Sequence, residues 1–139
     1  MTNDTRTLRR AAITAVGHYV PDKILANAEL ERMVDTTDEW IVTRTGIKER
    51  RIAAADQCTS DMGAAAARRA MEQAGVRAEE INLIICATIT PDMPFPATAC
   101  LIQQKLGAKR AAAFDMEAAC SGFLYGLEIG QQFIACGTY

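Results

Sequence analysis

The side chain best placed for nucleophilic chemistry is the thiol of Cys120. It follows a strand-length apolar run, 111–115, and comes just before a segment, 121–136, whose pattern predicts a helix ended by Gly137. Open α/β sheets bind ligands at the carboxyl ends of their strands. The positive end of a helix dipole favours a thiolate by up to ~2 kcal/mol, and the backbone N–H of Cys120 can face a developing oxyanion. The position therefore allows a nucleophilic cysteine, although spacing alone favours a small buried packing residue.

The other four cysteines carry no comparable signal. Cys86 lies inside a strand-length apolar run and Cys100 inside an expected helix, so packing is the interpretation for both. Cys58 and Cys136 lie near element ends. An odd number of cysteines without CxxC or HxxxH spacing argues against a disulfide framework and against a zinc site, and it suits a reducing cytoplasm.

Composition narrows the class of protein. The 139 residues suffice for one ordinary domain, and 50% of them are hydrophobic, so a core can form. The 15 basic and 17 acidic residues give a net charge of −2, which argues against general nucleic-acid binding. No apolar run approaches the ~20 residues that span a membrane, and the polar start of the chain lacks the apolar core of a signal peptide. We therefore expect a cytoplasmic protein without nucleic-acid or membrane partners.

Apolar runs, caps and glycines predict alternating strands and helices after a flexible tail at 1–9. Strands are expected at 12–17, 83–88 and 111–115, and helices at 28–34, from 38 to the stop at Gly46, and at 61–74, 97–106 and 121–136. Such alternation predicts an α/β fold with a mostly parallel sheet and right-handed crossovers.

Helix starts are predicted from cap residues. Asn27 is expected to cap the helix at 28–34, either Thr36 or Thr37 the next helix, and Ser60 the long alanine-rich one. Pro96 is expected as the first residue of its helix, because its missing N–H is not needed there. These signals fix the expected order of elements but leave their contacts open.

Four segments of the chain resemble segments of one enzyme family, and they occur in the same order along the chain as in that family. They are DTTDEWIVTRTGIKER at 35–50, AACSGF at 118–123, FPATAC at 95–100 and GHYVP at 17–21. Together they resemble the β-ketoacyl-acyl-carrier-protein synthase III family, and the resemblance runs from about Ala12 to the end of the chain.

The resemblance implies a thiolase-like fold, in which two similar α/β halves form five layers, αβαβα. Residues 10–139 then form the N-terminal half, and the C-terminal half is expected to be absent. The implied activity is an acyltransferase reaction: a decarboxylative Claisen condensation of a short acyl-CoA, often acetyl-CoA, with malonyl-acyl-carrier protein. It passes through an acyl-cysteine, starts fatty-acid synthesis, needs no metal or other cofactor, and is carried out by a cytoplasmic homodimer.

Site residues follow from the same resemblance, residue by residue. Cys120 matches the nucleophile, Trp40 the aromatic that stacks on the CoA adenine, and Arg44 a contact to the CoA phosphates. Thr36 lies beside the nucleotide, and Phe95 reaches across the dimer to close the partner's acyl pocket. Without the resemblance, the favoured interpretation is that Trp40 anchors its helix in the core and that Arg44 is a solvated cation at the helix end.

The family's catalytic histidine and asparagine have no match here. The single histidine, His18, lies where the family keeps no catalytic base, so we expect it to be structural or at the surface. We therefore expect the 139 residues alone to be inactive and not independently stable. Three alternatives stay open: a specialised relative that primes polyketide or quinolone-type synthesis, a hydroxymethylglutaryl-CoA-synthase-like enzyme, and a non-catalytic thiolase-fold fragment.

Overall fold

The computed structural model describes residues 9–139. The flexible tail expected at 1–9 lies outside the described residues except for its last position. The described chain forms two compact units, one made of 19–58 and the other of 59–139 together with 9–18. Each unit is presented by itself below.

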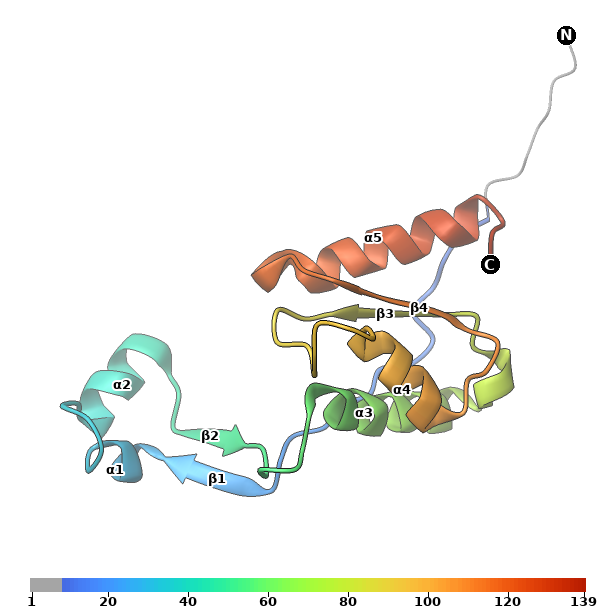
Figure 1. The fold of residues 1–139 in the computed structure, drawn as a ribbon. Coiled ribbons are helices and arrows are strands. Elements are labelled where there is room, and N and C mark those ends of the chain that lie inside the picture. Colours follow the sequence, from blue (N-terminus) through green and yellow to red (C-terminus); the bar gives the residue numbers. More distant parts are fainter. Residues whose placement is uncertain (1–8) are drawn as a thin grey trace, which may run out of the picture. The chain divides into compact units, whose positions relative to one another are not determined.

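The larger unit contains a parallel β–α–β arrangement. Its elements are α3 (Thr59–Ala74), the 3₁₀ turn η1 (Ala78–Glu80), β3 (Leu83–Ala87), α4 (Thr98–Leu106), β4 (Ala112–Met116), the 3₁₀ turn η2 (Ala119–Ser121) and α5 (Gly122–Ala135). Strands β3 and β4 pair in parallel, from Leu83 opposite Ala112 to Ala87 opposite Met116. Figure 1 shows α5 on one side of this pair and α3 with α4 on the other. The helices therefore cover both faces, as the apolar run of β3 predicts.

Small residues let α3 and α4 pack closely. A Cβ added to Gly63 of α3 would lie 2.7 Å from the Cδ1 atom of Ile102 on α4. Ala64, Ala99 and Ile102 are buried in the same unit. The small residues of α3 therefore allow the two helices to pack closely.

The strand expected at 12–17 is not formed. The backbone N–H of Val16 donates instead to the side-chain Oε1 of Gln73 on α3, at 3.3 Å. A Cβ at Gly17 would lie 2.1 Å from the carbonyl oxygen of Ala66. This prediction was wrong because the segment packs against a helix and finds no strand partner among the described residues.

The smaller unit is a strand pair that carries two short helices. It consists of β1 (Lys23–Ala26), α1 (Asn27–Leu30), α2 (Asp38–Thr45) and β2 (Glu49–Ile52). The strands are antiparallel, with Lys23 opposite Ile52 and Ala26 opposite Glu49. Sequence reasoning missed both, because each has only four residues, and neither the KILA sequence of β1 nor the ERRI sequence of β2 alternates apolar and polar side chains.

Several predicted helix ends are confirmed. The Oγ1 atom of Thr37 accepts a 3.1 Å hydrogen bond from the backbone N–H of Trp40, and so caps α2. Gly46 ends α2 in the left-handed region, at a φ of 72°. Among the described residues, positive φ angles also occur at the glycines that stop the other long helices: Gly75, Gly107 and Gly137.

Three predictions about where helices begin were wrong. Asn27 is itself the first residue of α1, which ends at Leu30, and its side chain makes tertiary bonds in place of a cap. Ser60 lies inside α3, where the Oδ1 atom of Asp92 accepts its backbone N–H at 2.8 Å. Helix α4 begins at Thr98, so Pro96 lies just before it. Within 9–139, no helix is long and apolar enough to cross a membrane.

Candidate functional site

Cys120 lies on the short turn η2 between β4 and α5, as the sequence predicts. The residue is exposed. Ala119 before it has a φ of 43°, a left-handed conformation that costs a residue with a side chain roughly 1–2 kcal/mol. The turn therefore reverses sharply and leaves the cysteine just ahead of the first turn of α5.

The turn is held against the ends of both parallel strands. Gly122, the first residue of α5, is buried, and a Cβ there would lie 3.0 Å from the Cβ atom of Ala87 at the end of β3. Because Met116 pairs with Ala87, Cys120 follows the carboxyl ends of β3 and β4. This is the edge at which α/β sheets place their ligands.

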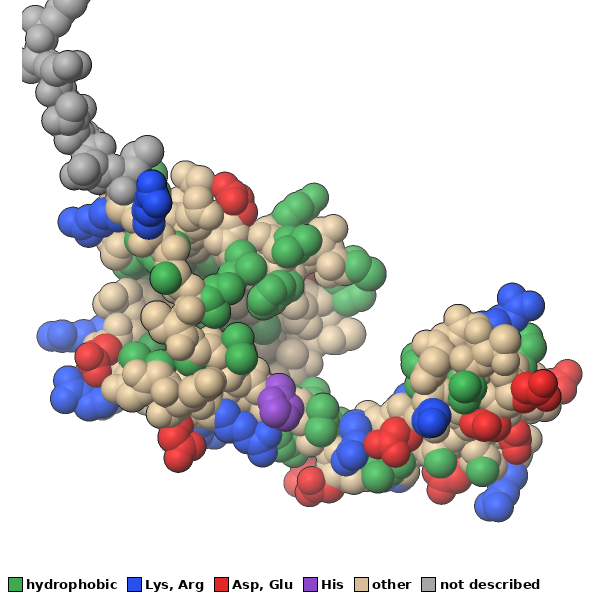
Figure 2. Space-filling model, turned by 180° about the vertical axis from the view of Figure 1, so that it is seen from behind, with side chains coloured by type: hydrophobic (Ala, Val, Ile, Leu, Met, Phe, Trp, Pro, Cys, Tyr) green, Lys and Arg blue, Asp and Glu red, His purple; other side chains and the backbone are tan. Residues whose placement is uncertain are grey.

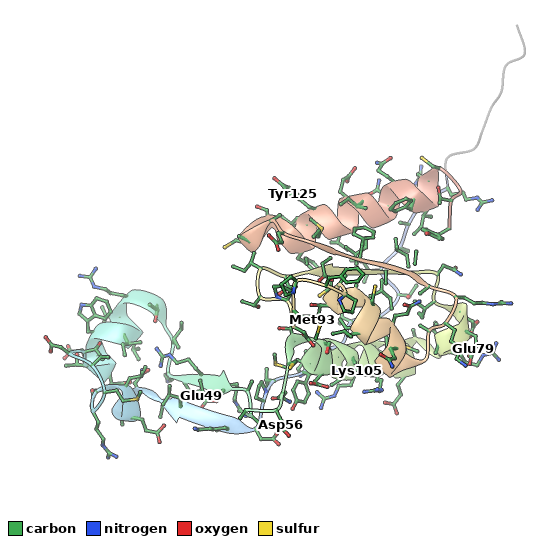
Figure 3. All side chains as sticks on the ribbon, viewed as in Figure 1. Glu49, Asp56, Glu79, Met93, Lys105 and Tyr125 are labelled. Carbon is green, nitrogen blue, oxygen red and sulfur yellow. The ribbon has the colours of Figure 1, made fainter. Side chains whose placement is uncertain are left out.

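Three large apolar side chains follow the cysteine in sequence and are open to solvent. On α5, Phe123, Leu124 and Tyr125 expose 69%, 65% and 56% of their surface. Figure 2 shows hydrophobic side chains exposed over the larger unit, and Figure 3 labels Tyr125 on α5. An apolar surface beside a nucleophile suits a substrate with a hydrocarbon chain.

Phe95 lies in the proline-rich loop before α4 and is 86% exposed. The same loop carries Met93, labelled in Figure 3, which is also exposed. The backbone N–H of Asp92 donates to the Oγ1 atom of Thr98 at 3.1 Å and ties the loop to the start of α4. The described residues therefore do not bury Phe95, and its role toward a second copy stays a prediction.

Cys86 has the environment of a packing residue. Burial, with smaller contributions from the carboxylates of Asp115 and Asp92, raises the pKa of its thiol to about 11. The thiol of Cys100, on α4, lies 3.8 Å from the carbonyl oxygen of Ala113. Both are less exposed than Cys120, which agrees with the packing interpretation.

A second group of predicted residues comes together on the smaller unit. The Arg44 guanidinium carbon lies 5.2 Å from the centre of the Trp40 ring, a cation–π contact, and Trp40 is 56% exposed. Two shallow hollows meet at this ring. One is lined by Thr37, Glu39, Trp40, Thr43 and Arg44, and the other by Asp35, Thr36, Thr37 and Trp40.

The exposure of Trp40 bears on one alternative. Among the described residues Trp40 is not a core anchor, because its ring is exposed and the buried residue of α2 is Ile41. A flat exposed ring beside a guanidinium can stack on a nucleobase and attract a phosphate. Thr36, Trp40 and Arg44 thus form one candidate binding surface, while Cys120 and Phe95 belong to the larger unit.

Two features of these sites were not foreseen. The positive φ of Ala119 has no signal in the sequence, because alanine rarely adopts it. Asn27 is 2% exposed and bonds to residues around α2, although its type and position predict only a cap. His18 is exposed, and its carbonyl oxygen accepts a 2.8 Å hydrogen bond from Arg69, in agreement with a structural or surface role.

The fold and the cysteine turn define a thiolase-like condensing-enzyme architecture. The chain superposes with a TM-score of 0.87 on 3-oxoacyl-[acyl-carrier-protein] synthase III from Aquifex aeolicus VF5, at 52% identity over 90% of this chain and 40% of that one. It superposes equally well, at 40% identity, on the priming β-ketosynthase of the R1128 polyketide pathway, covering 95% of this chain and 40% of that one.

Sequence comparison finds similarity to one family within that class. The family model of 3-oxoacyl-[acyl-carrier-protein] synthase III matches residues 114–139, which include Cys120. The chain is 61% identical over 132 residues to β-ketoacyl-[acyl-carrier-protein] synthase III of Symbiobacterium thermophilum, covering 95% of this chain and 40% of that protein. The protein of the same name from Geobacillus kaustophilus is 58% identical over 129 residues, 93% of this chain and 42% of that protein.

Over nearly its whole length the chain is therefore similar to proteins named β-ketoacyl-[acyl-carrier-protein] synthase III. It spans about 40% of the length of the curated relatives it matches. The fold class and the family resemblance expected from the sequence are both confirmed.

Proposed function

We propose that the protein carrying this chain is an acyltransferase that condenses a short acyl-CoA, such as acetyl-CoA, with malonyl-acyl-carrier protein. The observation that carries the proposal is the exposed Cys120 on the turn between β4 and α5, inside the segment that the family model matches. In the family that the chain resembles, this reaction starts fatty-acid synthesis.

The chemistry follows from a thiolate at that turn. The sulfur of Cys120 attacks the carbonyl carbon of the acyl-CoA thioester, and CoA leaves as its thiol, so one thioester replaces another. The malonyl group then loses CO₂, and its α-carbon attacks the acyl carbon. The sulfur of Cys120 departs, and the product is a 3-oxoacyl-carrier protein. The family resemblance implies that a histidine and an asparagine outside the quoted motifs assist the decarboxylation. None of these steps needs a metal or a redox cofactor.

The candidate CoA surface is the face of α2. The Trp40 ring offers a stacking platform for the adenine, and Arg44 offers a charge for the phosphates. Thr36 lines the adjoining hollow. The cation–π contact holds the ring and the guanidinium together before any ligand arrives.

The proposal also covers the oligomeric state, the cellular compartment and the activity of the 139 residues alone. The exposed Phe95 suits an aromatic that closes the acyl pocket of a second copy, because a monomer gains little from exposing it. Among the described residues Cys86, Cys100, Cys120 and Cys136 are free thiols, which suits a reducing cytoplasm. The catalytic partners of Cys120 are expected beyond the motifs above, so we propose that the 139 residues alone do not condense.

A specialised priming enzyme is the second candidate. The similarity to the R1128 priming β-ketosynthase, with a TM-score of 0.87, favours it specifically. The two candidates differ in the acyl group that Cys120 accepts, so a series of acyl-CoA esters of increasing chain length separates them. A preference for acetyl-CoA supports the fatty-acid role.

The test is acylation of the full-length protein with radioactive acetyl-CoA, followed by proteolysis and peptide mapping. We expect one labelled peptide, containing Cys120, and no label in Cys120→Ala. Cys136→Ala is the matched control, because Cys136 is also exposed but lies at the opposite end of α5. Label on Cys58 or Cys136 in place of Cys120 contradicts the proposal.

A further inference from the structure

Asn27 is a polar residue that the smaller unit buries almost completely, with 2% of its surface exposed. A buried amide destabilises a fold unless its donors and acceptor are paired. Here both N–H groups and the oxygen of the side chain are used. The burial therefore reflects a specific set of contacts, and those contacts surround α2.

The two amide donors of Asn27 reach the two ends of α2. One donates to the Oδ1 atom of Asp38, the first residue of the helix, at 2.7 Å. The other donates to the carbonyl oxygen of Ile47, just past the Gly46 cap, at 2.9 Å. One side chain thus fixes the entry and the exit of the helix.

The bonds of Asn27 to Asp38 and Ile47 form what we call the Asn27 clamp. The side-chain oxygen of Asn27 links this clamp to the strand pair. It accepts a hydrogen bond from the guanidinium of Arg50 on β2. The backbone N–H of Asn27 donates to the carbonyl oxygen of Lys48 at 3.3 Å and extends the β1–β2 ladder. The helix is therefore fastened to the most regular part of its unit.

Helix α2 has little else to hold its orientation. It has eight residues, too few for a stable isolated helix, and Ile41 is its buried residue. Its N-terminus is supported by Thr37 and by Glu31, whose Oε1 atom accepts the backbone N–H of Asp38 at 2.6 Å. Those bonds fix the first turn alone, whereas the Asn27 clamp also fixes the segment that follows Arg44.

We infer that Asn27 is a positioning residue for the acyl-CoA site: it holds α2 so that Trp40 and Arg44 present one ligand-binding face. The inference rests on the proposed function, which assigns this face to CoA. Asn27 itself, being buried, touches no substrate. Loosening α2 should weaken acyl-CoA binding and leave the chemistry at Cys120 intact.

The test measures steady-state kinetics of the full-length protein. Asn27→Ala should raise the KM for acetyl-CoA by about tenfold. The kcat at saturating acetyl-CoA and the KM for malonyl-carrier protein should stay within about twofold. Asp38→Ala, which removes one bond of the clamp, should raise the same KM by about threefold. Asp38→Asn keeps an oxygen acceptor for Asn27 and should restore a near-normal KM.

Two controls separate positioning from folding. Calorimetric titration with CoA alone should reproduce the KM order without any catalysis. Ser60→Ala removes a different buried polar side chain, bonded to Asp92 in the larger unit, and should lower Tm without changing the KM for acetyl-CoA. If Asn27→Ala does not fold, the contrast between Asp38→Ala and Asp38→Asn, both at an exposed residue, decides the question.

The outcomes distinguish this inference from the proposed function. An unchanged KM in Asn27→Ala and Asp38→Ala, with a raised KM in Trp40→Ala, overturns the clamp and leaves the CoA site standing. An unchanged KM in Trp40→Ala overturns the CoA site itself, and the inference with it. A loss of kcat in Asn27→Ala with both KM values unchanged marks a purely structural residue and also overturns the inference.

Discussion

The carboxylate of Asp115 accepts a 2.7 Å hydrogen bond from the backbone N–H of Thr98, so a residue of β4 caps the start of α4. Its second oxygen accepts the backbone N–H of Ala99 at the same distance. Both N–H groups belong to the first turn, which has no partner within the helix. The contact joins the first turn of α4 to the strand that leads to Cys120.

Removing this cap should destabilise the larger unit. Asp115→Ala leaves two N–H groups in the first turn of α4 without their carboxylate, and we expect the free energy of unfolding to fall by about 2 kcal/mol. Urea denaturation of the full-length protein measures the change. Glu117→Ala, at an exposed position two residues away, is the control and should cost less than about 0.5 kcal/mol. Equal effects in the two variants would show that the cap contributes nothing.

Gly17 should tolerate no side chain. A Cβ there would lie 2.1 Å from the carbonyl oxygen of Ala66 and 2.7 Å from the backbone nitrogen of Ala70, so the segment must move away from α3. Gly17→Ala should destabilise by about 1–3 kcal/mol, the usual range for overpacking. Gly130→Ala, where nothing lies within 4 Å of the added Cβ, should be neutral or stabilising. Thermal unfolding of both variants checks the difference, and an equally stable Gly17→Ala contradicts the contact.

The thiol of Cys86 should resist alkylation until strongly alkaline pH. Its pKa is raised to about 11, and a raised pKa keeps the neutral thiol at neutral pH, where the reactive thiolate is scarce. Iodoacetamide labelling followed by mass spectrometry should therefore modify Cys86 appreciably only as the pH approaches that value. Asp115→Asn removes one of the two negative charges that raise the pKa, so labelling should begin at lower pH. Rapid labelling of Cys86 at neutral pH contradicts its packing role.

The residue types close to Cys120 in the sequence made much of the structure around this turn predictable. The apolar run before Cys120 and the glycine at 137 mark a strand and the end of a helix, and both elements form where expected. The φ of Ala119 could not be predicted, because the tertiary fold imposes it against the residue's own preference. The predicted site residues and roles remain predictions until they are measured.

Tertiary contacts also explain the predictions that failed. The type of Asn27 favours a helix cap, yet three partners distant in sequence bind its side chain. The apolar pattern at 12–17 favours a strand, yet Val16 bonds to Gln73 on α3. Strand β2 begins with three charged residues, Glu49 to Arg51. They give no apolar pattern from which its pairing with β1 could be predicted. In each case the missing information was a partner far along the chain.

The last prediction concerns the exposed face of α2 and uses charge to separate its residues. Trp40→Ala should raise the KM for acetyl-CoA about fivefold or more, because base–aromatic stacking is worth ~1–3 kcal/mol. Arg44→Gln should raise it too, but the effect should shrink as salt is added, because exposed charges are screened. Glu39 lines the same hollow, so Glu39→Gln removes a charge that repels phosphate and should lower this KM. The KM for malonyl-carrier protein should not move in any of the three variants. Steady-state kinetics at two salt concentrations measures all of these values, and equal changes in both KM values for Trp40→Ala would point to a folding defect instead of a nucleotide site.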